Sequence, residues 1–135
     1  DCWVDTTKYD EWGTVNGNPV YFDKNNRQVK NAWVSTGGKY YYLNNSGYRV
    51  SGWKVDSTTG QTYYLDLTTG EMKKGWINLN NNWYYLGLNG VMHKGWLYLN
   101  GKWYYFTPNG LMVVNQSMYV DDKVYNFGQD GAVIA

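Results

Sequence analysis

Residues 75–92 read Gly75-Trp76-Ile-Asn-Leu-Asn-Asn-Asn-Trp83-Tyr-Tyr-Leu-Gly-Leu-Asn-Gly90-Val-Met92. Residues 95–112 repeat this stretch nearly residue for residue, as Gly-Trp-Leu-Tyr-Leu-Asn-Gly-Lys-Trp-Tyr-Tyr-Phe-Thr-Pro-Asn-Gly-Leu-Met. A period of about 20 residues with fixed aromatic and glycine positions is typical of solenoids and repeat arrays. We therefore expect the function to lie between repeats rather than in one active-site pocket.

A glycine, or an asparagine in its place, closes each of six such units. The closing residues are Asn26, Gly47, Gly70, Gly90, Gly110 and Gly131. Glycine and asparagine enter the left-handed backbone region at low cost, so this position is expected to be a backbone turn rather than a ligand contact. The units are about 12–31, 32–51, 52–74, 75–94, 95–114 and 115–135, and residues 1–11 are expected to be a linker or a degenerate repeat.

Each unit is predicted to be a β-hairpin. A short aromatic run such as residues 83–86 suits a strand, and a preceding pair such as Asn100-Gly101 suits a tight primed turn. Side chains alternate along a strand, so Trp83 and Tyr85 face one side of the hairpin and Tyr84 and Leu86 the other. One hairpin can therefore contact two neighbours. Because a lone hairpin is marginal in water, we expect an all-β stack of about six hairpins with little helix.

Composition excludes several classes of partner. Aromatic residues make up 19% of the 135-residue chain, so the core is expected to be aromatic. With 12 basic and 11 acidic residues the net charge is +1, which is too small to attract nucleic acid by bulk electrostatics. No apolar run approaches membrane-spanning length, so no membrane insertion is expected.

The sequence offers little for catalysis or metal binding. His93 is the only histidine and has no nearby cysteine or second histidine, so we expect a solvated surface side chain rather than a metal ligand. Asp66 and Glu71 form the one pair suggestive of glycosidase carboxylates, but the best-formed repeats lack equivalents, so a surface turn explains them better. We assign no catalytic residue, metal or cofactor, and any enzyme domain is expected outside this chain.

From about Trp12 to Ala135, the Gly-Trp, Trp-Tyr-Tyr-Leu/Phe and Gly-x-Met pattern resembles the choline-binding repeats of cell-wall-binding proteins. Such proteins occur in pneumococci, related Gram-positive bacteria and their phages. The resemblance implies a left-handed superhelix of hairpins that holds choline groups of teichoic acid between consecutive repeats. It also implies an extracellular module at the bacterial cell-wall surface that anchors a lysin or an adhesin.

In that family a site combines the tryptophan of Gly-Trp, the first aromatic of the following run and the first tyrosine of the next run, often with the methionine after glycine. The resemblance implies two complete sites, which are Trp76, Trp83 and Tyr104 with Met92, and Trp96, Trp103 and Tyr125 with Met112. It implies a third at Trp33, Tyr40 and Tyr63, and a fourth at Trp53 and Tyr84 with Met72.

Departures from the pattern weaken the other interfaces. Arg49 stands at the methionine position expected for the third site, where its charge would repel a quaternary ammonium, and Thr62 replaces an aromatic wall of the fourth. The first interface offers Trp12 and Tyr41, but Pro19 replaces its middle aromatic.

The chemistry agrees with the resemblance, because a trimethylammonium cation donates no conventional hydrogen bond and is matched by electron-rich ring faces. Two alternatives stay open. The same rings would stack on a glucan or other wall polysaccharide, or the hairpins would form an adhesin stalk that faces a host protein. A homodimer is a further partner hypothesis, because the apolar residues 132–135 end the chain and leave a strand edge unpaired.

Overall fold

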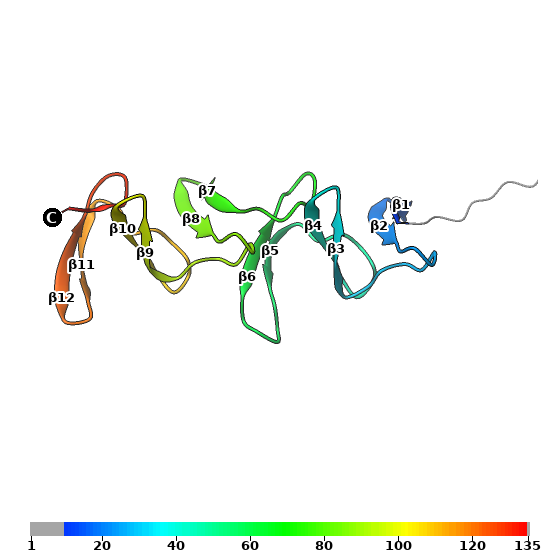
Figure 1. Cartoon of the computed structure of the whole chain (residues 1–135), viewed down its shortest axis with the longest axis horizontal. Helices are drawn as coiled ribbons and strands as arrows, with labels where there is room; N and C mark the ends of the chain where they lie inside the picture. Colours follow the sequence, from blue (N-terminus) through cyan, green and yellow to red (C-terminus); the bar gives the residue numbers. More distant parts are fainter. Residues whose placement is uncertain (1–9, 135) are drawn as a thin grey trace, which may run out of the picture. The chain divides into compact units, whose positions relative to one another are not determined.

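A computed structural model describes residues 10–134, and this part of the chain is all-β (Figure 1). Its strands are β1 (Glu11–Val15), β2 (Asn18–Phe22), β3 (Ala32–Thr36), β4 (Lys39–Leu43), β5 (Gly52–Val55), β6 (Thr62–Leu65), β7 (Gly75–Leu79), β8 (Asn82–Leu86), β9 (Gly95–Leu99), β10 (Lys102–Phe106), β11 (Gln116–Val120), β12 (Lys123–Phe127) and β13 (Val133–Ile134). Consecutive strands pair two by two, and β13 joins the last pair as a third strand. The predicted fold class of about six hairpins is confirmed.

Tight turns connect the strands of five hairpins. In the turn between β7 and β8, Asn80 and Asn81 have φ angles of 53° and 68°, and in the turn between β9 and β10 Asn100 and Gly101 have 52° and 82°. Two consecutive positive φ angles identify the primed turn that matches strand twist, as predicted. The hairpin of β5 and β6 differs, because a longer loop is held there by Asp56, whose Oδ1 accepts the backbone N–H groups of Thr58 and Thr59.

A closing loop follows the second strand of each hairpin and returns the chain to that strand. Gly90 and Gly110 lie in these loops with φ angles of 82° and 84°, which confirms the predicted backbone turn. Two residues further on, Met92 bridges to Leu86 and Met112 bridges to Phe106. In the last repeat the bridge extends into β13, where Val133 pairs with Phe127. Val133 and Ile134 therefore pair on one side with β12.

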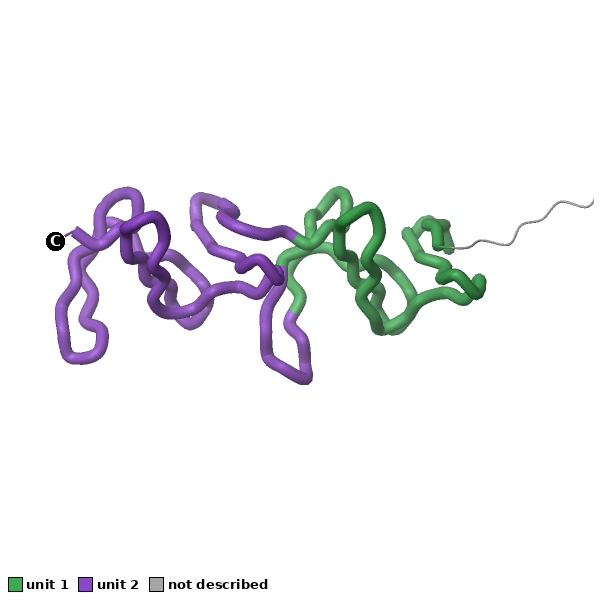
Figure 2. The backbone as a smooth tube through the Cα atoms, viewed as in Figure 1, with its two compact units in different colours: residues 1–54, 64–72 green, residues 55–63, 73–135 purple. Residues whose placement is uncertain are grey.

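The chain divides into two compact units (Figure 2). Unit 1 holds the residues up to Lys54 together with Tyr64–Met72, and unit 2 holds Val55–Tyr63 together with Lys73–Ala135. Of the predicted linker or degenerate repeat at 1–11, residues 1–9 lie outside the described part, and Glu11 already begins β1. Among the described residues, no helix has the length and apolar character that crossing a membrane requires.

Rings and buried aliphatic side chains form the core between consecutive hairpins. The last residue of the second strand is fully buried in several repeats, and these residues are Leu43, Leu65, Leu86 and Phe106. In unit 1 the rings of Trp12 and Tyr41 lie 4.9 Å apart, and in unit 2 those of Trp96 and Tyr125 lie 4.8 Å apart. Within each unit, a hairpin thus turns its tryptophan toward the tyrosine of the next hairpin. The predicted use of both hairpin faces is confirmed.

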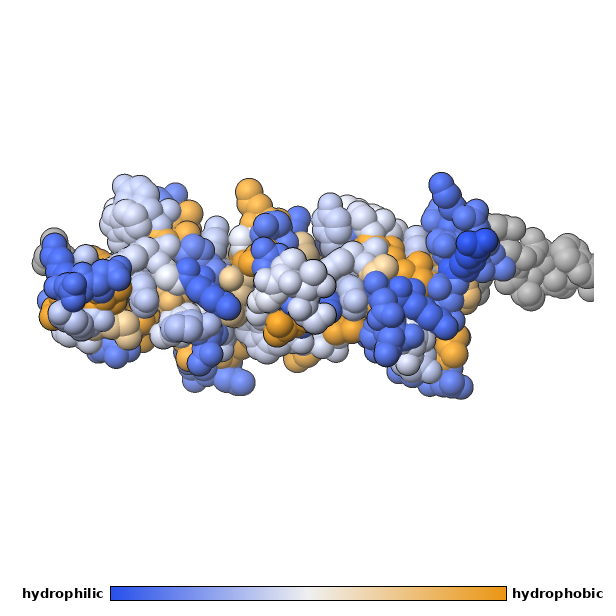
Figure 3. Space-filling view, turned by 90° about the horizontal axis from the view of Figure 1, so that it is seen from below, coloured by the Kyte–Doolittle hydropathy of each residue, from blue (hydrophilic) through white to orange (hydrophobic). Residues whose placement is uncertain are grey.

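The surface mixes polar and apolar residues. In the face shown in Figure 3, strongly apolar side chains form small areas separated by hydrophilic and intermediate ones. Among the large exposed side chains are several rings, including Tyr40, Trp53, Trp83, Tyr98, Trp103 and Tyr119. A core that is aromatic therefore leaves ring faces accessible to a ligand.

Candidate functional site

One cavity of unit 2 lies where β7 and β8 meet the next hairpin, and we call it the Trp76 box. Trp76 lies opposite Tyr85 in the strand register, and Trp83 lies diagonally across the same face. The centroid of the Trp76 ring is 6.2 Å from that of Trp83 and 5.2 Å from that of Tyr104, with interplanar angles of 85° and 70°. The three rings border a cavity of about 380 Å³, whose lining also includes Met112, Gln129 and Asp130.

The Trp96 box repeats this geometry one hairpin later in unit 2. The Trp96 ring centroid is 6.1 Å from that of Trp103, at 90°, and 4.8 Å from that of Tyr125, at 70°. These rings and Val133 line a cavity of about 350 Å³. The structure therefore brings together the three rings of both complete sites implied by the resemblance.

Each box has one fixed tryptophan and one open tryptophan. The ring of Trp76 also contacts Tyr85 at 5.1 Å and Phe106 at 5.9 Å, so the core holds it in place. In contrast, Trp83 is 42% exposed and Trp103 is 49% exposed. Leaving large apolar rings in water is costly to stability, and a ligand enclosed by the box would cover them.

The methionines differ from the expected grouping by one repeat. Met112, and not Met92, lines the Trp76 box, while Val133 takes this position in the Trp96 box. The reason is the path of the closing loop, which carries the N–H of Met112 back to the carbonyl of Trp83 at 3.0 Å. The N–H of Met92 donates in the same way to Thr62, at 2.7 Å. Met92 and Met112 therefore each lie at the interface between their own hairpin and the preceding one.

The same shift moves Arg49 to another interface. The N–H of Arg49 donates to the carbonyl of Pro19 at 2.9 Å, so this residue belongs with Trp12 and Tyr41 in what we call the first interface. Its guanidinium carbon lies 5.3 Å from the centroid of the Trp12 ring, and its Nη2 donates to the carbonyl of Thr68. The first interface thus holds a cation of the chain itself. Arg49 does not stand at the Trp33 site as expected.

Residues of the third and fourth candidate sites fall in both units. Trp33 and Tyr40 lie in unit 1, where the N–H of Met72 donates to the Tyr40 carbonyl at 2.8 Å. Met72 therefore accompanies Tyr40 rather than Trp53. Tyr63 lies in unit 2, and its hydroxyl donates to Gln61.

The fourth candidate site is divided in the same way. Trp53 packs on Tyr64 in unit 1 with ring centroids 4.9 Å apart, and Tyr84 lies in unit 2. The sites built on Trp33 and on Trp53 accordingly stay predictions.

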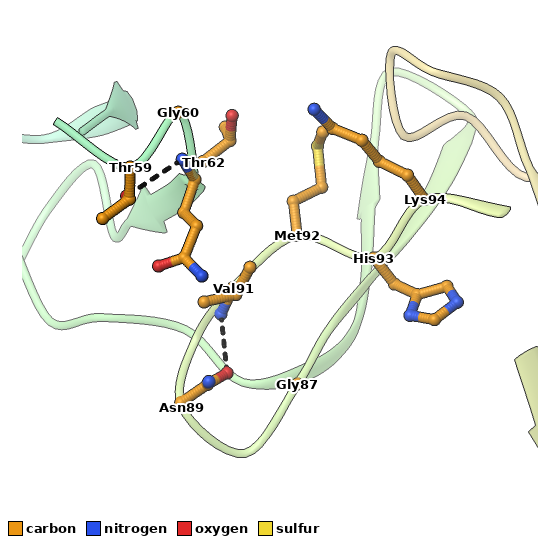
Figure 4. A pocket seen from close by; sticks show the side chains of 10 residues that line it. Thr59, Gly60, Thr62, Gly87, Asn89, Val91, Met92, His93 and Lys94 are labelled. Carbon is orange, nitrogen blue, oxygen red and sulfur yellow. Dashed lines mark hydrogen bonds between the residues drawn. The ribbon is translucent and has the colours of Figure 1, made fainter. Parts of the chain in front are cut away.

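A polar hollow of about 430 Å³ surrounds Thr62, at the position that Trp83 and Trp103 occupy in the two boxes (Figure 4). Its lining contains threonine, glutamine, asparagine and lysine side chains and no Trp, Tyr or Phe ring. His93 also belongs to this lining, and its Nε2 lies 2.7 Å from the carbonyl of Trp96. Because His93 is half-buried and also packs on Phe106, the expectation of a solvated surface histidine was wrong.

The two carboxylates that could suggest glycosidase chemistry have structural partners. The Oδ1 atom of Asp66 accepts the N–H groups of Thr68 and Thr69 at 2.8 and 2.9 Å. Glu71 forms an ion pair with Lys39 at 3.0 Å. Both residues therefore stabilise a turn and its surroundings, in agreement with the turn interpretation.

The comparison with protein families gives one match. The choline-binding repeat matches residues 10–49, 33–74 and 73–117, which together span most of the chain. The chain has no match among curated protein sequences.

Solved structures resemble the chain along nearly its whole length. CbpJ from Streptococcus pneumoniae TIGR4 is 35% identical with a TM-score of 0.83, over 91% of this chain and 41% of CbpJ. Choline binding protein F from Streptococcus pneumoniae is also 35% identical, with a TM-score of 0.81, over 93% of this chain and 40% of that protein. The modular Cpl-1 endolysin, solved with a peptidoglycan analogue, is 28% identical with a TM-score of 0.63, over 99% of this chain and 40% of Cpl-1.

The chain thus spans about 40% of the length of these relatives. The repeat matches, the hairpin fold and the ring boxes between consecutive hairpins agree with one another. The chain belongs to the choline-binding repeat family.

Proposed function

We propose that this chain is a non-catalytic cell-wall-binding module that recognises choline groups of teichoic acid at the Trp76 and Trp96 boxes. The observation that carries the proposal is the convergence of three rings on one cavity, which occurs twice in unit 2 with nearly the same distances. A sugar ring would be matched by one flat platform flanked by hydrogen-bonding groups. Rings that meet nearly at right angles instead surround a compact rounded group such as trimethylammonium.

The strength of one box follows from its rings. Each ring face contributes about 0.5 to 2 kcal/mol to the binding of a cation, depending on how far the site is desolvated. Association itself costs several kcal/mol, so one box is expected to bind free choline with a Kd on the order of 1 mM. Recognition at one site alone would be too weak to hold a protein on a surface.

The presence of two boxes compensates for the weak binding of a single box. Two boxes one hairpin apart can engage neighbouring choline groups of the same polymer, which raises avidity by roughly 10²- to 10⁴-fold over one site. Further sites at Trp33, Tyr40 and Tyr63 and at Trp53 and Tyr84 would add to this effect. We infer that the module anchors a larger lysin or surface protein at the bacterial cell wall, with any catalytic or adhesive part outside this chain.

Titration with choline tests the proposal, with tryptophan fluorescence and calorimetry as readouts. We expect saturable binding and retention on a tertiary-amine resin. The matched control is 3,3-dimethylbutanol, a neutral molecule of nearly the same shape, which should bind more weakly because it lacks the charge that ring faces attract. No saturable change with choline and no retention on the resin would rule out choline recognition, and saturation by a glucan oligosaccharide instead would favour polysaccharide binding.

A further inference from the structure

The Trp76 box has a feature that the Trp96 box lacks, which is a carboxylate in its lining. Gln129 and Asp130 line the cavity together with the three rings and Met112. Both residues lie in the closing loop that follows β12, two hairpins further along the chain than Trp76 itself. The lining of the Trp96 box consists of three rings and Val133 and contains no acidic side chain.

Backbone and side-chain partners hold Asp130 in place. Its Oδ1 accepts the N–H of Ala132 at 3.0 Å, and its Oδ2 lies 3.6 Å from Nζ of Lys102. The hydrogen bond from Ala132, together with the charge of Lys102, holds the pKa of Asp130 below its ordinary value. The carboxylate is therefore ionised at neutral pH and has a fixed backbone anchor.

The corresponding position is uncharged in every other repeat. The residue immediately before the closing glycine or asparagine is Asn25, Ser46, Thr69, Asn89 or Asn109 in the first five repeats. A short polar residue is enough to form these loops, as Asn89 shows by accepting the N–H of Val91. The loop therefore does not require a charge, and the negative charge of Asp130 has two neighbours outside the loop, which are Lys102 and the Trp76 box.

We propose that Asp130 is a specificity-determining residue of the Trp76 box, where its carboxylate attracts the quaternary ammonium of choline and favours it over a neutral ligand. This inference rests on the choline recognition proposed above. Ring faces attract a cation but also accept apolar groups, whereas a carboxylate at the rim adds an attraction that only a cation experiences. The two boxes of unit 2 then differ in selectivity although their rings are arranged alike.

The size of the effect is set by exposure and by Lys102. Opposite charges a few ångströms apart in water-like surroundings change affinity by about fivefold, and salt reduces the change. Lys102 neutralises part of the carboxylate charge, and the side chains of both residues are more than half exposed. We expect Asp130 to raise the choline affinity of the Trp76 box by about two- to fivefold at low salt.

A titration of the full chain that resolves each site tests this inference. The indole N–H resonances of Trp83 and Trp103 report the Trp76 box and the Trp96 box in one sample. With Asp130→Asn, which keeps the acceptor for Ala132, choline should bind the Trp76 box about two- to fivefold more weakly at low salt and nearly as well as wild type at 0.5 M salt. Affinity at the Trp96 box should not change, and neither should the affinity of either box for 3,3-dimethylbutanol.

Two results would overturn the inference. One is an unchanged choline affinity at the Trp76 box, and the other is an equal loss for choline and for 3,3-dimethylbutanol, which would indicate altered packing instead of lost charge. Lys102→Met provides a second variant and should strengthen choline binding at the Trp76 box, because it leaves the carboxylate unpaired. If the wild-type chain binds no choline at either box, the proposed function fails together with this inference. That result can be told apart from the two results above, because in those the wild-type chain still binds choline.

Discussion

The first interface and the Trp76 box are built on the same backbone pattern but contain different groups. In each, a tryptophan of one hairpin contacts a tyrosine of the next, at 4.9 Å for Trp12 and Tyr41 and at 5.2 Å for Trp76 and Tyr104. The first interface then has Arg49 over its tryptophan, where the Trp76 box has Met112 in its lining.

Backbone geometry at the two places hardly differs. The N–H of Arg49 lies 2.9 Å from the Pro19 carbonyl, and the N–H of Met112 lies 3.0 Å from the Trp83 carbonyl. The first interface has Pro19 and Arg49 where the Trp76 box has Trp83 and Met112. The same backbone hydrogen bond forms in both, so the stacking of these hairpins does not depend on those side chains. We therefore expect these two side chains to determine whether an interface accepts an external cation or holds one of the chain itself.

Removing the open wall of the Trp76 box should have the largest effect. With Trp83→Ala we expect the choline affinity of this box to fall by at least tenfold, because the site loses a ring worth up to about 2 kcal/mol and its enclosure. Calorimetry should then count one site fewer. Tyr119→Ala is the control, since it removes an exposed ring that lines neither box and should leave the number of sites unchanged. An unchanged site count for Trp83→Ala would contradict the assignment of this box.

Converting the first interface into a box should create a site. The double change Pro19→Trp and Arg49→Met supplies the missing ring and removes the internal cation, so we expect one additional choline site with an affinity within about tenfold of the Trp76 box. Arg49→Met alone should add little, because one wall is still missing. If circular dichroism shows an intact fold and calorimetry finds no added site, the difference between the two interfaces lies outside these side chains.

A smaller but measurable effect, on stability rather than on choline affinity, is expected from the packing of Met92 against the closing glycine Gly110. A Cβ added at Gly110 would collide with the side chain of Met92, whereas one added at Gly101 would meet nothing within 4 Å. Both glycines have positive φ, so each alanine variant carries a backbone cost of about 1 to 2 kcal/mol. Gly110→Ala should lower the free energy of unfolding by about 1 to 3 kcal/mol more, as measured in urea. Equal losses would show that the methionine contact does not hold the hairpins together.

The smallest effect is expected for the ion pair of Lys39 and Glu71, which lies in unit 1 and lines none of the described cavities. Hydrogen bonding to Glu71 raises the pKa of Lys39. Any stability from this shift is present at neutral pH and is lost as the pH rises through the raised pKa of Lys39. Because exposed pairs contribute little, Glu71→Gln should leave the melting temperature at pH 7 within about 2 °C of wild type. A larger drop would show that this pair supports the stack.

Local features of the fold were predictable from the sequence because short residue pairs determine them. Asn100 and Gly101 indicate a primed turn without any knowledge of the neighbouring hairpins, and Gly110 indicates a positive φ in the same way. The alternation of Trp83 and Tyr84 likewise specifies which ring faces which neighbour.

Contacts between the closing loop and a preceding hairpin could not be predicted from short residue pairs. Met112, Arg49 and Asp130 each belong to an earlier interface than their position suggests, since the loop carries them back toward a preceding hairpin. The sequence does contain one signal for the path of this loop. The residue two positions after the closing glycine forms a β-bridge to the last residue of the second strand of its own hairpin. How close that residue comes to the preceding hairpin, however, depends on how the hairpins stack, which the sequence pattern does not specify.

A crystal structure of the chain soaked or grown with choline tests the central claim most directly. We expect trimethylammonium groups enclosed by Trp76, Trp83 and Tyr104 and by Trp96, Trp103 and Tyr125, with Arg49 still over Trp12 and no choline there. Choline bound between Trp12 and Tyr41, or both boxes empty at a saturating choline concentration, would contradict the claim.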